Sequence, residues 1–86
     1  MENLQLQLDR TETELRIRNY SPRTVKIYLH FLREYFGFLG TQFNEQPETA
    51  IKDFLLRLEA KGASPQTRNL CLSALKFYYR HVVRDK

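Results

Sequence analysis

Cysteine, glycine and proline are scarce in this sequence. Its 86 residues include one cysteine, Cys71, three glycines and three prolines. One cysteine cannot form a disulfide within the chain, so we expect a reducing, cytoplasmic environment. With few glycines and prolines, 42% hydrophobic and 28% charged residues, the composition is typical of a folded globule and not of a disordered segment. The length allows one domain, residues 1–86, with a single modest core.

Long apolar runs, a secretory signal and metal-ligand spacings are also missing. No hydrophobic stretch approaches the ~20 residues that are needed to cross a bilayer. The first ten residues, MENLQLQLDR, alternate leucine with polar residues and do not have the pattern of a secretory signal. His30 and His81 stand at no ligand spacing, and no glycine-rich phosphate loop occurs. We therefore expect no membrane partner, no metal and no cofactor.

The five tyrosines raise the question of a catalytic nucleophile. A nucleophilic tyrosine needs a base and a group of cations or donors around it. Tyr28, Tyr35, Tyr78 and Tyr79 lie on apolar helical stripes, where a place in the core is the expected one, and Tyr20 stands beside a helix start, where it should pack as a hydrophobic staple. The sequence predicts no catalytic residue in this chain.

One pattern occurs twice. Residues 21–36, SPRTVKIYLHFLREYF, and residues 64–79, SPQTRNLCLSALKFYY, align without a gap at a distance of 43 residues. In each copy the serine can accept a hydrogen bond from an amide of the first helical turn, and the proline suits the first helical position. The matches are Ser21 with Ser64, Pro22 with Pro65, Thr24 with Thr67, Leu29 with Leu72, Leu32 with Leu75 and Tyr35 with Tyr78. The repeat predicts two long helices with sharply defined N-termini.

Apolar periodicity predicts four helices in all. The first covers roughly residues 3–18, where Leu4, Leu8, Thr11 and Leu15 form a narrow stripe that packs at the edge of the domain or, as the alternative, against another chain. The others run over residues 21 to 38 or 39, 47 or 48 to 61, and 64 to about 84, with a loop at 41–44 and Gly62 as a left-handed cap. With no strand signal, the expected fold is all-α, a four-helix bundle-like domain of two crossed hairpins.

The net charge of +4 is unevenly distributed. Residues 20–40 carry +2 and residues 62–86 carry +4, whereas residues 1–19 and 41–61 carry −1 each. The basic segments are the two that hold the repeated helix. Such a partition is a plausible footprint for a polyanion, although a small domain also acquires it by chance.

The two repeated helix starts are the candidate binding site. Each presents hydroxyl groups, amide or basic side chains and the positive end of a helix dipole, which are groups that hold phosphates. Arginine, lysine, glutamine and asparagine side chains also reach base edges in a major groove. The candidate residues are Arg23, Thr24, Lys26, Gln66, Thr67, Arg68 and Asn69.

The same residues resemble a known family. Tyr20-Ser21-Pro22-x-Thr24 is followed by Tyr28, Leu32 and Phe36, and about forty residues later come Lys61-Gly62-x-Ser64-x-x-Thr67 and the run LSALKFY at 72–78. This pattern is similar to the N-terminal core-binding, SAM-like domain of tyrosine recombinases, the phage integrase and Xer-type family. The resemblance covers roughly residues 8–83, and its second half is the more specific.

The resemblance implies a function for the chain. A domain of this kind forms half of a clamp around double-stranded DNA, with the second and fourth helices facing the major groove, and its first helix can touch a neighbouring recombinase subunit. Carried over by position, the seven candidate residues above become the DNA-facing ones. The family's cleavage residues belong to a separate C-terminal domain, which would be this chain's partner in the full-length protein, so the chain alone is expected to bind DNA and not to cut it.

Two other functions stay open at this point. The chain could be a helical protein–protein interaction module. Its apolar residues would then form the interface with the partner, and its excess of basic residues would only increase solubility. An intact enzyme with a tyrosine nucleophile would capture nicked DNA covalently. Binding through several phosphates should weaken steeply with salt, whereas an apolar interface should not.

Overall fold

A computed structural model describes residues 4–40 and 47–83 of the chain. They form four α-helices, α1 (Leu4–Ile17), α2 (Pro22–Leu39), α3 (Pro47–Ala60) and α4 (Pro65–Tyr78), and a π-helical turn, η1 (Tyr79–Val83). Within these two ranges there is no strand. The predicted loop at 41–44 and the predicted helix end at residue 84 lie outside the described residues.

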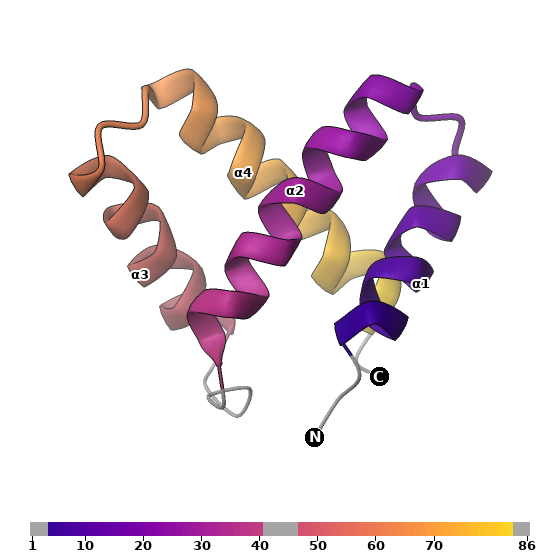
Figure 1. The fold of residues 1–86 in the computed structure, drawn as a ribbon, viewed down its shortest axis with the longest axis horizontal. Helices are drawn as coiled ribbons and strands as arrows, with labels where there is room; N and C mark the ends of the chain where they lie inside the picture. Colours follow the sequence, from indigo (N-terminus) through magenta and orange to yellow (C-terminus); the bar gives the residue numbers. More distant parts are fainter. Residues whose placement is uncertain (1–3, 41–46, 84–86) are drawn as a thin grey trace.

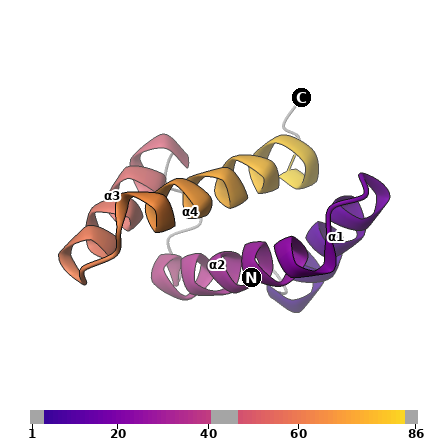
Figure 2. The ribbon, with the colours of Figure 1, turned by 90° about the horizontal axis from the view of Figure 1, so that it is seen from above.

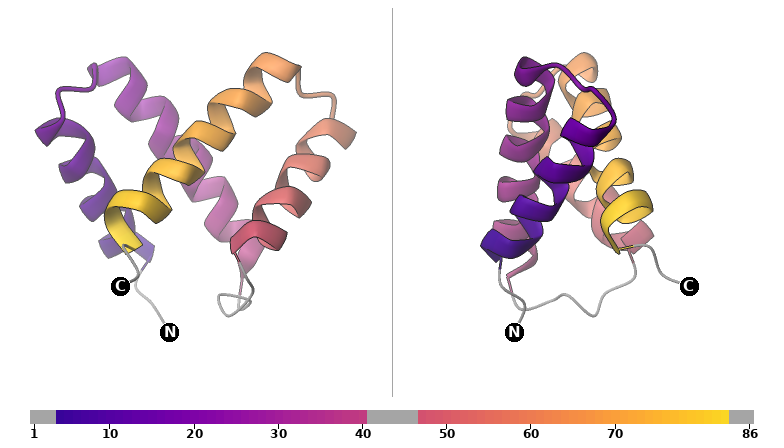
Figure 3. Two further views of the ribbon diagram at one scale, coloured as in Figure 1. Left: turned by 180° about the vertical axis from the view of Figure 1, so that it is seen from behind. Right: turned by 90° about the vertical axis from the view of Figure 1, so that its right-hand side faces the viewer.

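The four helices are arranged as two hairpins that cross. In Figure 1, α1 and α2 form one hairpin, α3 and α4 form the other, and α2 passes in front of α4. The view from behind places α4 in front of α2, and the view from above shows the hairpins as two layers (Figures 2 and 3). The Cα atoms span 34 × 29 × 22 Å. This is the all-α fold of crossed hairpins that the sequence predicts.

The repeat extends over both hairpins and is not confined to α2 and α4. The bounds of α1 and α3 are also 43 residues apart at each end. The turns match as well: Asn19, with φ 64°, stands where the second hairpin has Gly62, with φ 96°. The Tyr20 amide donates to the Leu15 carbonyl at 3.1 Å, and the equivalent bond from Ala63 to Leu58 measures 3.0 Å. The left-handed cap predicted at Gly62 is confirmed, and Asn19 is its counterpart.

The core lies where α2 and α4 cross. Leu32, Tyr35, Cys71 and Leu75 are each 0% exposed there. A second group of buried side chains fills the space between α1, α2 and α4. Its members are Leu15, Val25, Tyr28, Ala74 and Phe77. Because both central helices are covered on two sides, their apolar faces are broad.

The tyrosines take the places that the sequence predicts. Tyr28, Tyr35 and Tyr78 are buried, and Tyr79 is half-buried against the core. Tyr20 packs at ring-centroid distances of 5.8 Å from Tyr28 and 5.4 Å from Phe77, next to the α2 start.

The fourth helix differs from the prediction in its last turn. The α-helical hydrogen bonds end at Tyr78 and the turn widens into η1, whereas the sequence predicts one regular helix. In this turn the Tyr79 hydroxyl lies 2.8 Å from the hydroxyl of Tyr35 in α2. The wider turn therefore accommodates a tertiary hydrogen bond, which periodicity within one helix cannot reveal.

The narrow stripe of α1 packs inside the domain. Leu8, Thr11 and Leu15 are buried, and α1 contacts both α2 and η1. The Thr11 hydroxyl donates to the Gln7 carbonyl at 2.8 Å, so its burial leaves no unsatisfied polar group. Of the two uses expected for this stripe, the structure supports packing within the chain.

No helix in the described ranges is long and apolar enough to span a membrane.

Candidate nucleic-acid interface

The starts of α2 and α4 lie along one edge of the molecule. The turns at residues 18–21 and 61–64 both stand at the top of Figure 1, one on each side of the crossing point. Figure 2 views this edge directly, with the two helices running away from it in opposite directions. The fold thus collects the positive ends of two helix dipoles on the same side of the domain.

The two starts are capped in the same way. Ser21 accepts a hydrogen bond from the Thr24 amide at 3.2 Å, and Ser64 accepts one from the Thr67 amide at 3.1 Å. Each serine hydroxyl also donates to the hydroxyl of that threonine, at 3.0 and 3.1 Å. Each threonine hydroxyl therefore accepts from the cap and retains its own proton to donate to a ligand.

Six of the seven candidate residues occupy equivalent positions in the two helices. The pairs that lie 43 residues apart are Arg23 with Gln66, Thr24 with Thr67, and Lys26 with Asn69. The four long side chains of these pairs are exposed, and the two threonines are half-buried. The structure brings these six residues to the same edge as the dipole ends.

Arg68 is placed differently from the other six. It stands at the position that Val25 holds in α2, and Val25 is 5% exposed. Arg68 accordingly turns inward, with one guanidinium nitrogen 3.8 Å from the carboxylate of Glu59. Its Nε is buried and has no hydrogen-bond partner in the described part of the chain. The sequence repeat could have indicated this inward position, since the equivalent residue in the first copy is a valine, which is typical of an inward-facing site.

The polar stripe that begins at the start of α4 continues along the helix. The exposed Asn69 of α4 is followed by Ser73 and Lys76 on the same helix and by Arg80 in η1, all exposed and three or four residues apart. A hollow of about 270 Å³ lies beside this stripe, and Tyr20, Tyr28, Phe77 and His81 also line it. The site predicted from the sequence does not include these residues, although helical spacing relates Ser73, Lys76 and Arg80 to Asn69.

Four ionisable groups of the core are held in their neutral forms. Burial is the largest cause that raises the pKa of Tyr28, Tyr35 and Tyr79 above the ordinary value of 10.0. Burial also raises the pKa of the Cys71 thiol to about 12. These groups stay protonated at neutral pH, so none of the four is prepared as a nucleophile. The described residues contain no cluster of three or more metal-binding side chains.

Comparison with known proteins gives two concordant results. The family model described as the N-terminal SAM-like domain of phage integrase matches residues 8–86. The chain is 30% identical over 80 residues to the tyrosine recombinase XerA of Thermococcus onnurineus (strain NA1), and 33% identical over 73 residues to the tyrosine recombinase XerA of Pyrococcus furiosus (strain ATCC 43587 / DSM 3638 / JCM 8422 / Vc1). These alignments cover 93% and 85% of this chain, and 27% and 24% of the two relatives. The chain therefore spans about a quarter of the length of these relatives. No solved structure matches it.

Proposed function

Because this chain belongs to the family of phage integrase N-terminal SAM-like domains, we propose that it binds double-stranded DNA during site-specific recombination, with α2 and α4 facing the duplex. One observation carries this proposal. Two identically capped helix starts, with their dipole ends and exposed polar side chains, lie along one edge of the domain. A duplex laid along that edge would meet both starts at once.

The two starts are suited to different contacts with the duplex. Arg23 and Lys26 on α2 are cations, which bind phosphates without regard to sequence. Gln66 and Asn69 on α4 are amides, which can pair with the donor and acceptor groups of a base edge. Thr24 and Thr67 would donate their hydroxyl protons to phosphates beside the helix amides. Arg68 would join them only by leaving Glu59, so we assign it the weakest contact.

The chemistry of recombination would belong to another part of the full-length protein. The chain spans about a quarter of relatives that are named tyrosine recombinases. The described tyrosines are packed in the core or beside a cap, and burial raises the pKa of Tyr28, Tyr35 and Tyr79, so these three phenols stay protonated at neutral pH. We propose a C-terminal catalytic domain and neighbouring recombinase subunits as the partners of this domain, with no strand cleavage by residues 1–86 themselves.

The salt dependence of DNA affinity tests the proposal. A labelled duplex is titrated with the domain at several salt concentrations between about 50 and 200 mM, and log affinity is plotted against log salt. Each phosphate that a variant no longer binds should reduce the slope by about 0.9, so Arg23→Ala with Lys26→Ala should flatten it by about 2 units. Gln66→Ala with Asn69→Ala should lower affinity or sequence preference and leave the slope nearly unchanged.

The matched control for the double change is Lys52→Ala, which removes an exposed cation from α3. It should leave the slope as it was. A slope that does not respond to Arg23 and Lys26, or amide shifts confined to α1 and α3 on addition of the duplex, would contradict the assignment. Association that is insensitive to salt would instead favour the helical protein–protein interaction module.

A further inference from the structure

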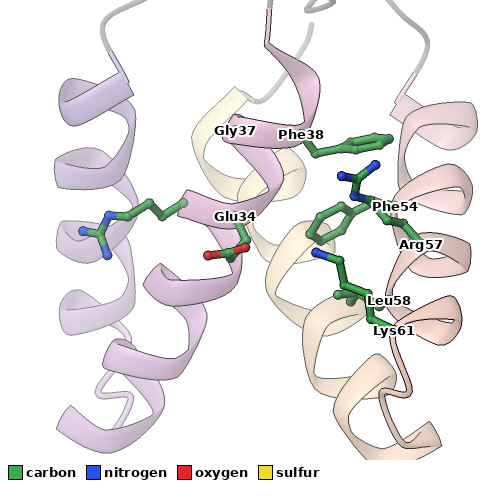
Figure 4. A pocket seen from close by; sticks show the side chains of 8 residues that line it. Glu34, Gly37, Phe38, Phe54, Arg57, Leu58 and Lys61 are labelled. Carbon is green, nitrogen blue, oxygen red and sulfur yellow. The ribbon is translucent and has the colours of Figure 1, made fainter.

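A second hollow lies between α2 and α3, away from the helix starts. Its volume is about 270 Å³. Figure 4 shows side chains facing each other across it: Phe38 of α2 reaches toward α3, and Arg57 of α3 and Lys61, the residue after this helix, reach toward α2. Glu34 of α2 adds an acidic group to its lining.

The charged groups of this hollow are not neutralised by one another. The ion pairs of the described residues join Arg16 with Glu12, Arg18 with Glu14, and Arg68 with Glu59. In that part of the chain, Arg57 and Lys61 have no acidic partner within ion-pair distance. Two cations, Arg57 and Lys61, therefore reach into the hollow beside one acid, Glu34, and the imbalance favours an anionic occupant.

The inner wall of the hollow is apolar. The rings of Phe38 and Phe54 lie 5.3 Å apart, and Phe54 is 3% exposed. The Arg57 guanidinium stands 5.6 Å from the centre of the Phe38 ring, which holds its charge at the rim. Gly37 has no atom within 4 Å of the position that a Cβ would take, so the α2 side is open. An apolar side chain of a ligand can enter between the cations.

We propose that this hollow binds an acidic peptide segment of a partner protein, anchored by one aromatic or large apolar side chain. Carboxylates of the segment would pair with Arg57 and Lys61, and the anchor would rest on Phe38 and Phe54. Glu34 would accept a hydrogen bond from the backbone of the segment. This inference is independent of the proposed DNA-binding function, because it uses none of the residues at the helix starts.

The lining favours a peptide over a DNA backbone. A duplex presents a row of phosphates and no apolar side chain, so it would leave Phe38 and Phe54 without a partner. Glu34 would repel a phosphate at the same rim. An interface with an apolar centre and charged residues around it is the usual arrangement for binding a protein segment.

The test uses synthetic peptides and amide-resolved NMR of the domain. The probe is the blocked hexapeptide DEFEDE, and its controls are NQFQNQ, which lacks the charge, and DEGEDE, which lacks the anchor. We expect DEFEDE to shift the amides of Gly37, Phe38 and Arg57 at about 0.1 M salt, with both controls binding at least roughly fivefold more weakly.

Two variants separate the hollow from general charge attraction. Arg57→Glu should weaken DEFEDE binding by about five- to twentyfold. Lys76→Glu makes the same charge change at the α4 position equivalent to Arg33, outside this hollow, and should change the affinity less than about twofold. A third variant, Gly37→Leu, fills the hollow without altering charge and should abolish the preference for DEFEDE over DEGEDE.

Each contrary result overturns the proposal. If NQFQNQ binds as tightly as DEFEDE, the cations do not contribute to recognition. If the Gly37→Leu variant still prefers DEFEDE over DEGEDE, the aromatic anchor does not occupy the hollow. Failure of DEFEDE to shift these amides at up to about 5 mM would exclude a specific peptide site. If a short duplex shifts the amides of Gly37, Phe38 and Arg57 and the peptide does not, the hollow belongs to the DNA interface.

Discussion

The two hairpins share a backbone and differ in surface chemistry. Helix starts, cap serines, positive-φ turns and turn hydrogen bonds repeat at 43 residues. At the equivalent exposed positions of the starts, the first hairpin has Arg23 and Lys26, whereas the second has Gln66 and Asn69. The shared backbone determines where the side chains of the two helix starts lie. The difference in side-chain chemistry determines what each start can bind. Equivalent substitutions in the two hairpins are therefore matched controls for each other.

The largest effect is expected at the pair of core leucines. Leu32 and Leu75 are equivalent, and both are 0% exposed at the crossing of α2 and α4. Leu32→Ala and Leu75→Ala should each lower the free energy of unfolding by about 2–5 kcal/mol, because each leaves a cavity in the core. Urea unfolding followed by circular dichroism measures both. If one change costs only a few tenths of a kcal/mol, the two hairpins do not share the core equally.

The tyrosine pair breaks the equivalence of the hairpins, since Tyr79 in η1 bonds to Tyr35 in α2. Tyr79→Phe leaves the hydroxyl of the fully buried Tyr35 without its partner and should cost about 1–3 kcal/mol in urea unfolding. Tyr35→Phe should cost less through the hydrogen bond, because the half-buried Tyr79 can turn its hydroxyl to water. Equal costs for the two changes would mean that both hydroxyls lose access to water in the native state.

The same pair predicts how stability depends on pH. The pKa of Tyr35 and of Tyr79 is raised in the folded state, mainly by burial, above an ordinary value of 10.0. Above pH ~10 the unfolded chain releases these protons first, so the free energy of unfolding should be level below that pH and fall as pH rises beyond it. Urea midpoints between pH 8 and pH 11 test this. Lysines titrate in the same range, so the double variant Tyr35→Phe, Tyr79→Phe is the control, and it should show a shallower fall.

A smaller effect is expected at the turns. Gly62 and Asn19 share a left-handed backbone conformation, in which a side chain with a Cβ is strained. Gly62→Ala should destabilise the domain by about 1 kcal/mol, and Asn19→Gly should leave it unchanged or stabilise it by a few tenths. In urea unfolding, the midpoint of Gly62→Ala should fall, and that of Asn19→Gly should stay the same or rise slightly. A neutral Gly62→Ala would show that the second turn can take another conformation.

The helices and turns of the two hairpins could be predicted from local sequence patterns. The features that depend on tertiary contacts could not. Ser21 and Ser64 with the prolines after them fix both helix starts through hydrogen bonds inside one turn, so the sequence alone was sufficient there. The η1 turn depends on Tyr35, which lies 44 residues before Tyr79, and helical periodicity does not report such a contact. The hollow between α2 and α3 likewise depends on how two hairpins pack. The inward position of Arg68 could be predicted in part. It follows from the sequence repeat, but only once the structure shows that the equivalent residue, Val25, is buried.

Arg68 therefore gives the smallest expected effect. Arg68→Val gives the second hairpin the residue that the first has at this position, and it removes a buried Nε that has no hydrogen-bond partner in the described part of the chain. The ion pair with Glu59 is long and its acid is well exposed, so its removal should change the free energy of unfolding by less than about 0.5 kcal/mol, or raise it. In the DNA titration, Arg23→Ala should reduce the salt slope by about 0.9, whereas Arg68→Val should reduce it by much less. A reduction by a full unit in Arg68→Val would mean that the guanidinium leaves Glu59 to reach a phosphate, which would make the two helix starts more alike on DNA than they are in the free domain.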